Sequence, residues 1–127
     1  MRGAMICIVD DDASVLRSLR ELLASDGLDS ETFDRPDKFL HYACANTVEL
    51  AVLDLWMPTQ NGIEVQERLL ELSPDTRVII ITGSEEPVIR TLAAEGGAFA
   101  LLIKPFEDEA FLDAVHGALG ETTQNGK

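Results

Sequence analysis

Five short apolar runs alternate with five longer amphipathic stretches, and this alternation constrains the fold more than any other feature of the chain. The first run, MICIV, is wholly apolar, and the fourth, RVIIIT, is rich in β-branched residues. Both patterns are typical of short strands that are buried on both faces of a sheet. The runs, and the strands that they predict, lie at residues 5–9, 28–33, 49–55, 77–82 and 99–103.

The stretches between these runs have the periodicity of helices. Within residues 13–25, leucines recur at helical spacing, Asp12 can cap the start, and Gly27 lies where a helix end favours positive φ. Single helices between strands imply a parallel sheet with helices on both faces, because such crossovers are right-handed. The sequence therefore predicts one α/β domain. Its helices are expected at residues 13–25, 36–44, 63–72, 87–95 and 108–119.

Composition excludes several classes of function. The chain has 10 Lys and Arg against 23 Asp and Glu, and a net charge of −13. Such an acidic chain repels phosphate backbones and anionic lipids, so we expect no direct binding to nucleic acid or membranes. The apolar runs are also too short to span a bilayer. Cys7 and Cys44 lack the spacing of a zinc or redox motif, so we expect buried free thiols in a reducing, cytoplasmic setting.

Polar side chains gather where the predicted strands end. Ligands of open α/β sheets bind outside the carboxyl ends of the strands, so we expect these side chains to converge. Taken singly, each has a simpler structural explanation, such as Asp12 as a helix cap or Lys104 in an ordinary turn. Their presence together on four strands is hard to explain by capping. They are Asp10, Asp11 and Asp12 after the first strand, Asp54 at the third, Thr82 at the fourth and Lys104 after the fifth.

Such a group of side chains favours phosphoryl chemistry. Neighbouring carboxylates repel one another unless a cation is present, and oxygen ligands suit Mg²⁺. Lys104 offers a compact positive charge for a phosphoryl oxygen, and Thr82 offers a hydroxyl donor. Asp54 lies among apolar residues at the end of a central strand, where its carboxylate could attack phosphorus and form an aspartyl phosphate.

Four motifs together resemble the response-regulator receiver domains of bacterial two-component systems. They are IVDDD, AVLDLWMPTQNG, IITGS and KPF, and the resemblance covers roughly residues 5–119. It is strongest to receivers of the nitrogen-fixation and nitrate-response type. It implies a flavodoxin-like (βα)5 fold, with a five-stranded parallel sheet of order 2-1-3-4-5. We expect residues 1–120 to form the receiver domain, and residues 121–127 to be a flexible tail or the stub of a linker.

The resemblance implies a role for each phosphoryl-binding residue. Asp54 resembles the phosphoacceptor, which takes a phosphoryl group from a histidine kinase or a phosphotransfer protein. Lys104 resembles the lysine that pairs with this group, and Pro105 the proline that follows it through a cis bond. Thr82 resembles the switch hydroxyl that turns toward a phosphoryl oxygen. The chain would then be a signalling phosphoacceptor and not an enzyme, since it promotes only its own phosphorylation and dephosphorylation.

The cofactor that the resemblance implies is Mg²⁺. Asp11 and Asp54 are expected to bind the ion directly and Asp10 to act through water. The backbone carbonyl of Trp56 is expected to complete the site.

Two residues depart from the family pattern. Three positions before the lysine the family usually has an aromatic switch residue, and this chain has Leu101. We therefore expect output coupling to be weakened or rerouted, through Phe99 or the helix at 87–95. Trp56 stands where the family more often has a polar or small residue. Its indole either shields the acyl phosphate from water or lies exposed with no kinetic role.

The resemblance also implies partners. A sensor kinase would contact the helix at 13–25, and an output domain or downstream protein would receive the signal. Dimerisation through residues 87–95, 99–103 and 108–119 fits the family as well. The chain is either a stand-alone receiver or part of a longer regulator.

Other functions fit the sequence less well. A phosphatase with an aspartyl nucleophile needs a second Asp two residues later, where this chain has Trp56. Nucleotide binding is disfavoured because neither GxxxxGK[ST] nor GxGxxG follows the first strand. The remaining alternative is a degenerate receiver that acts as a phosphorylation-independent interaction module. Leu101 leaves this alternative open, whereas the intact Asp54 and Lys104 speak against it.

Overall fold

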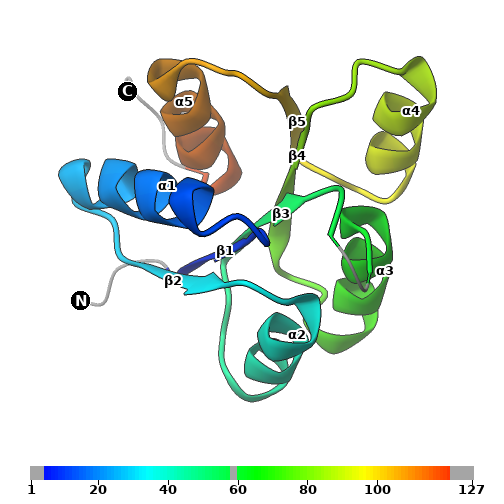
Figure 1. Cartoon of the computed structure of the whole chain (residues 1–127). Helices are drawn as coiled ribbons and strands as arrows, with labels where there is room; N and C mark the ends of the chain where they lie inside the picture. Colours follow the sequence, from blue (N-terminus) through cyan, green and yellow to red (C-terminus); the bar gives the residue numbers. More distant parts are fainter. Residues whose placement is uncertain (1–4, 58–59, 121–127) are drawn as a thin grey trace.

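The computed structural model describes residues 5–57 and 60–120, in which strands and helices alternate from end to end (Figure 1). Every predicted element is present, with ends that differ from the prediction by at most two residues. The elements are β1 Ile6–Val9, α1 Ala13–Ser25, β2 Ser30–Phe33, α2 Pro36–Ala45, β3 Leu50–Asp54, α3 Gly62–Leu72, β4 Arg77–Thr82, α4 Pro87–Glu95, β5 Ala100–Ile103 and α5 Asp108–Ala118.

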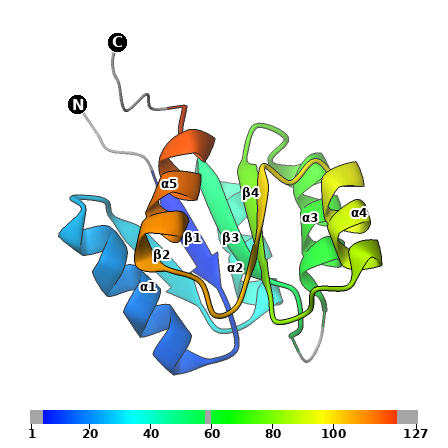
Figure 2. The ribbon, with the colours of Figure 1, turned by 90° about the horizontal axis from the view of Figure 1, so that it is seen from above.

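Within the described residues the strands form one parallel sheet in the order β2-β1-β3-β4-β5. The central strand β3 pairs with β1 on one side and with β4 on the other. Helices α1 and α5 cover one face of the sheet, and α2, α3 and α4 cover the other (Figures 1 and 2). The predicted flavodoxin-like fold and its strand order are therefore confirmed.

The sheet separates two apolar layers, because successive side chains of a strand point to opposite faces. Strands β1 and β3 are buried along their whole length, as their apolar runs predicted. The layer under α1 and α5 includes Ile6, Ile8, Leu23, Val52, Ile79, Phe111 and Val115. The layer under α2, α3 and α4 includes Cys7, Val9, Phe39, Leu53, Val65, Leu69, Ile80 and Ile89.

Side-chain caps fix the starts of the two helices that follow β1 and β3. At α1, Oδ1 of Asp12 accepts a hydrogen bond from the N–H of Ser14 at 2.9 Å. At α3, Asn61 and Glu64 form a reciprocal capping box, with N–O distances of 2.9 and 3.0 Å. Gly27, past the end of α1, has a φ of 78°, as the sequence predicted.

The prediction for one of the cysteines is wrong. Both cysteines are free and Cys7 is buried, but Cys44 is exposed. Cys44 follows the buried Ala43 on α2, and each further residue of a helix turns by about 100° around its axis. This turn carries the thiol from the core to solvent.

No helix in the described ranges has the length and apolar character needed to cross a membrane. The tail predicted at 121–127 lies outside the described residues, as do Pro58 and Thr59.

Candidate functional site

The carboxyl ends of β1, β3, β4 and β5 meet at one edge of the sheet. Asp10 follows β1, Asp54 ends β3, Thr82 ends β4 and Lys104 follows β5. Strands β3 and β4 are still paired at Asp54, and β4 and β5 are still paired at Thr82. The sheet therefore brings these predicted side chains to the same place.

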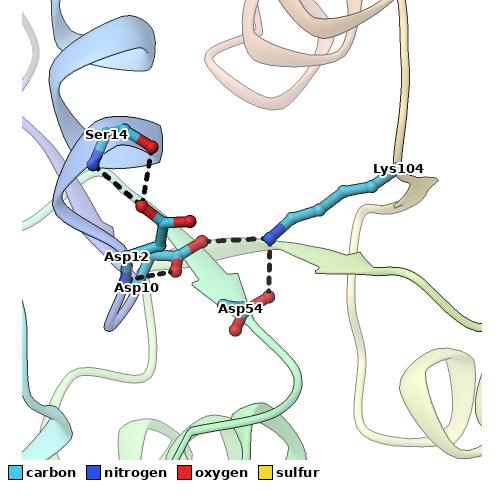
Figure 3. A network of polar contacts seen from close by, with 5 residues as sticks. All are labelled: Asp10, Asp12, Ser14, Asp54 and Lys104. Atoms are coloured by element: carbon cyan, nitrogen blue, oxygen red, sulfur yellow. Dashed lines mark hydrogen bonds and ion pairs between the residues drawn. The ribbon is translucent and has the colours of Figure 1, made fainter.

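Lys104 bridges two buried carboxylates. Its Nζ lies 3.3 Å from Oδ2 of Asp10 and 3.2 Å from Oδ1 of Asp54 (Figure 3). The side chains of Asp10 and Asp54 are 3% and 9% exposed, whereas that of Lys104 is 33% exposed. The ammonium thus makes charge-assisted contacts inward and keeps part of its surface in solvent. From this position it could also contact an anionic group that enters from outside.

Burial changes the titration of all three groups. Burial, and next the charge of Asp10, raises the pKa of Asp54 to about 6, although Lys104 acts in the opposite direction. Burial also raises the pKa of Asp10, against the N–H of Asp12 and the charge of Lys104. Burial would lower the pKa of Lys104, but the two carboxylates outweigh it and raise that pKa. One ammonium therefore does not neutralise the site, and a further cation would stabilise it.

Asp10, Asp11 and Asp54 form an oxygen cluster of the size that a divalent cation needs. One carboxylate oxygen from each lies within 4.8 Å of the other two. Mg²⁺ binds oxygen at about 2.1 Å, so ligands on opposite sides of the ion are about 4.2 Å apart. Asp11 is exposed whereas Asp10 and Asp54 are buried, so the cluster opens to solvent on the Asp11 side. The donors and their spacing fit Mg²⁺.

Asp12 has the structural role that the sequence allowed. Its carboxylate turns to α1, where the hydroxyl of Ser14 donates to Oδ1 at 2.7 Å (Figure 3). The hydrogen bonds from Ser14 lower the pKa of Asp12. The N–H of Asp12 donates to Oδ1 of Asp10 at 2.9 Å. Asp12 thus orients Asp10 through its backbone and caps the helix through its side chain.

Thr82 is fully buried, and hydrogen bonds link it to the start of α4. Its Oγ1 accepts from the N–H of Ser84 at 3.0 Å, and Oγ of Ser84 accepts from the N–H of Glu86 at 3.2 Å. Glu86 is the N-cap residue of α4. In the sequence Ser84 appeared only within the motif IITGS, although a hydroxyl two residues before a helix cap is a recognisable turn signal.

Gly62, at the start of α3, packs against the backbone of Asp54. A Cβ at this position would lie 2.8 Å from the carbonyl oxygen of Asp54 and 3.2 Å from Cα of Leu55. In the sequence Gly62 appeared only as the last residue of the motif AVLDLWMPTQNG, which does not reveal this contact. The neighbouring Trp56 is 58% exposed. Both roles expected for its indole therefore stay predictions.

The sequence matches the family of response regulator receiver domains over residues 6–116. The chain belongs to this family. It is similar to the response regulator protein TodT of Pseudomonas putida, with 35% identity over 118 residues, 93% of this chain and 52% of TodT. The chain thus spans about half the length of that relative.

Solved structures of receivers agree with the fold. A response regulator receiver protein from Burkholderia phymatum is 39% identical, with a TM-score of 0.84 and coverage of 94% of this chain and 98% of that one. A CheY-like receiver domain protein from Methanospirillum hungatei is 26% identical, with a TM-score of 0.89 and coverage of 94% and 95%.

This receiver keeps Leu101 half-buried under α4, in the apolar layer that contains Ile80, Ile89 and Ala93. Phe99, just before β5, is 46% exposed. Its ring lies over α5, where a Cβ added at Gly117 would be 2.9 Å from Cζ of Phe99.

A cavity of about 500 Å³ lies between α1 and the β5–α5 loop of the receiver. Val15 and Leu19 line it from α1, and Pro105 and Phe106 line it from the loop, next to Lys104. The peptide bond between Lys104 and Pro105 is cis. The cavity is mainly apolar, and Lys104, whose ammonium contacts Asp54, is one of its lining residues.

Proposed function

We propose that this receiver takes a phosphoryl group onto Asp54 from the phosphohistidine of a kinase or phosphotransfer protein. The observation that carries the proposal is the contact of 3.2 Å between Lys104 Nζ and Asp54, at the point where the central strand ends. It places one buried carboxylate beside a partly exposed cation. That arrangement suits a nucleophile whose product is a phosphoryl group with more negative charge than the carboxylate it replaces.

The transfer exchanges one bond to phosphorus for another. An Oδ atom of Asp54 forms the new O–P bond while the N–P bond of the phosphohistidine breaks. The electron pair of that bond returns to the imidazole, which leaves as the neutral ring because its second nitrogen carries a proton. Lys104 donates a hydrogen bond to a phosphoryl oxygen, and its raised pKa keeps it protonated during the step.

Asp10, Asp11 and Asp54 are the side chains that would hold Mg²⁺, with Asp10 acting through water and the carbonyl of Trp56 as a further ligand. When bound, the ion neutralises negative charge on the carboxylates and on the phosphoryl oxygens. Asp12 supports the site by orienting Asp10 through its N–H. The exposed position of Asp11 gives the ion access from solvent.

The kinase is proposed to dock at the cavity between α1 and the β5–α5 loop. Val15, Leu19, Pro105 and Phe106 offer it apolar surface, and Lys104 marks the edge nearest to Asp54. An apolar surface beside the nucleophile would hold the phosphohistidine near the carboxylate.

Output is proposed to pass from Thr82 to the face formed by α4, β5 and α5. If Thr82 turns toward a phosphoryl oxygen, the N–H of Ser84 loses its acceptor, and the loop that leads into α4 changes. The face carries the exposed side chains of Val88, Leu92 and Phe99. It could contact an output domain, a downstream protein or a second copy of the receiver. We propose that this signalling takes place in the cytoplasm.

Acetyl phosphate and Mg²⁺ test the proposal, with intact mass as the readout. We expect a mass gain of one phosphoryl group in the parent protein and no gain in Asp54→Asn. The matched control is Asp75→Asn, an exposed aspartate before β4 at the opposite edge of the sheet, which should gain the same mass as the parent.

The same experiment decides between this proposal and the alternative, a degenerate receiver that acts as a phosphorylation-independent interaction module. If the folded parent gains no mass with Mg²⁺ present, the phosphoacceptor proposal is wrong and the interaction-module reading is favoured. If Asp54→Asn gains the same mass as the parent, the phosphorylated residue is a different one.

A further inference from the structure

Gln66 is a buried polar side chain that the proposed phosphotransfer does not use. It lies on α3 and is 1% exposed. Its Nε2 donates to the carbonyl oxygen of Ala93 in α4 at 3.4 Å, which is long for a hydrogen bond. Its Oε1 has no hydrogen-bond partner among the residues that the structure describes. A buried carbonyl oxygen without a partner lowers stability, because it has lost its bond to water.

The end of α4 is shaped around this amide. Gly96 lies so close that a Cβ at this position would be 2.7 Å from Oε1 of Gln66. The carbonyl of Ala93 also accepts from the N–H of Ala98 at 3.0 Å, and Gly97 has a φ of 91°. These are the features of a Schellman helix end, which satisfies Ala93 without help from Gln66. The carbonyl of Ala93 therefore does not need the amide of Gln66 as a donor.

Helix α4 has few other attachments. Ile89 and Ala93 are its buried residues, whereas Val88 and Leu92 are exposed. At its other end, the hydrogen bonds of Ser84 link the helix start to Thr82. Segments with few buried apolar contacts open at low free energy, so one poor contact has a large relative effect on α4.

We infer that Gln66, at the contact between α3 and α4, keeps the resting position of α4 marginally stable, because its buried Oε1 has no partner among the described residues and its Nε2 makes only a long hydrogen bond. An apolar side chain of the same length would fill the same space without the cost of Oε1. The consequence for signalling rests on the proposed function. If α4 moves when Asp54 is phosphorylated, a less stable resting position shifts the equilibrium toward the moved one.

Native-state hydrogen exchange of the unphosphorylated protein tests the inference. Gln66→Met keeps the length of the side chain and removes its polar atoms. We expect the amides of α4 to exchange at least about fivefold more slowly in this variant than in the parent, given the usual cost of an unsatisfied buried group. The amides of α1, on the other face of the sheet, should keep their rates and serve as the internal control.

Gly96→Ala provides a change of opposite sign. The new Cβ would displace the Gln66 amide, so the α4 amides should exchange faster than in the parent. Gly96 has a φ of −78°, which alanine adopts without strain. In a Gln66→Ala background the clash is absent, so Gly96→Ala should there change the exchange of α4 little. A cycle of the four proteins isolates the contact.

Two results would overturn the inference. Slower exchange throughout α1 and α5 as well as α4 in Gln66→Met would mean a general packing effect. Unchanged or faster exchange of α4 would mean that the hydrogen bonds of Gln66, including any to a buried water, do not weaken the resting helix.

A second arm measures how α4 exchange changes on phosphorylation, at equal phosphorylated fraction by mass. We expect a smaller change in Gln66→Met than in the parent, and an equal change would refute the link to signalling. If the parent takes no phosphoryl group, the proposed function fails. The comparison of unphosphorylated proteins still decides the role of Gln66.

Discussion

Asp54 is an acid in a position where its own negative charge is costly. Burial and the nearby Asp10 raise its pKa to about 6, so the folded protein binds a proton there more tightly than the unfolded chain does. Below pH 4 both states are protonated at this residue, and the raised pKa contributes its full stability. As pH rises from about 4 through about 6, the unfolded chain ionises first and that stability is lost.

Asp54→Asn should therefore stabilise the protein at pH 7.5 in the presence of a chelator. A pKa raised from 3.8 to about 6 corresponds to an upper bound of about 3 kcal/mol, at about 1.4 kcal/mol per pH unit. We expect a gain of about 1–3 kcal/mol in urea denaturation at pH 7.5 and almost none at pH 4. An Asn variant less stable than the parent at pH 7.5 would mean that the ion pair with Lys104 outweighs burial.

Gly62→Ala should destabilise the protein although alanine is the better helix former. The added Cβ would meet backbone atoms of Asp54 and Leu55, which cannot rotate away as a side chain can. We expect a loss of about 1–3 kcal/mol in urea denaturation, typical of overpacking. Gly83→Ala is the control, because nothing lies within 4 Å of a Cβ there. Equal stability of the parent and Gly62→Ala would show that α3 shifts freely relative to Asp54.

At the scale of elements, the sequence predicted the sheet and helices well because their signals are local. Strands buried on both faces appear as continuous apolar runs, and Asp12 and Gly27 mark the ends of α1. Contacts between elements that are distant in the chain have no comparable local signal in the sequence. The amide of Gln66 meets Gly96 across thirty residues of chain, and no spacing rule connects them.

The site residues could also be predicted from local signals in the sequence, whereas some of the contacts between them could not. Parallel strands end together, so Asp10, Asp54 and Lys104 could be placed at one edge from their positions after strands. The hydrogen bond from Ser84 to the Thr82 hydroxyl depends on the path of a loop, which apolar periodicity does not specify. Cys44 shows that apolar neighbours in the sequence do not bury a residue on the outer side of a helix.

The capping box of α3 gives a prediction at this scale. Asn61→Ala removes the acceptor for the N–H of Glu64, and it leaves that donor at the helix start without its partner. We expect a loss of about 1 kcal/mol in the free energy of unfolding. Asn46→Ala, at the exposed end of α2, is the control and should cost less, since the side chain of Asn46 donates to the carbonyl of Tyr42 in the preceding turn and does not cap a helix start. Losses of equal size at both positions would contradict a specific role for the box.

For the whole molecule, the excess of acidic residues adds to the local repulsion at the sheet edge. A net charge of −13 opposes compaction, and salt screens this repulsion over about 10 Å at 0.1 M. Any salt should therefore stabilise the protein to some extent. A divalent cation held by Asp10, Asp11 and Asp54 should act further, because it binds the folded state alone.

Thermal unfolding at constant ionic strength separates the two effects. We expect Mg²⁺ to raise the Tm of the parent with the logarithm of its concentration above the Kd, by an amount that corresponds to about 2.7 kcal/mol at 100 times the Kd. Asp11→Asn removes an exposed ligand of the cluster and should lose most of this gain, while its response to NaCl stays that of the parent. Asp75→Asn changes the net charge equally at a distant exposed position and should respond to Mg²⁺ as the parent does. If Mg²⁺ and NaCl raise the Tm of the parent equally at matched ionic strength, the cluster binds no ion. The stabilisation would then come from screening of the whole acidic surface.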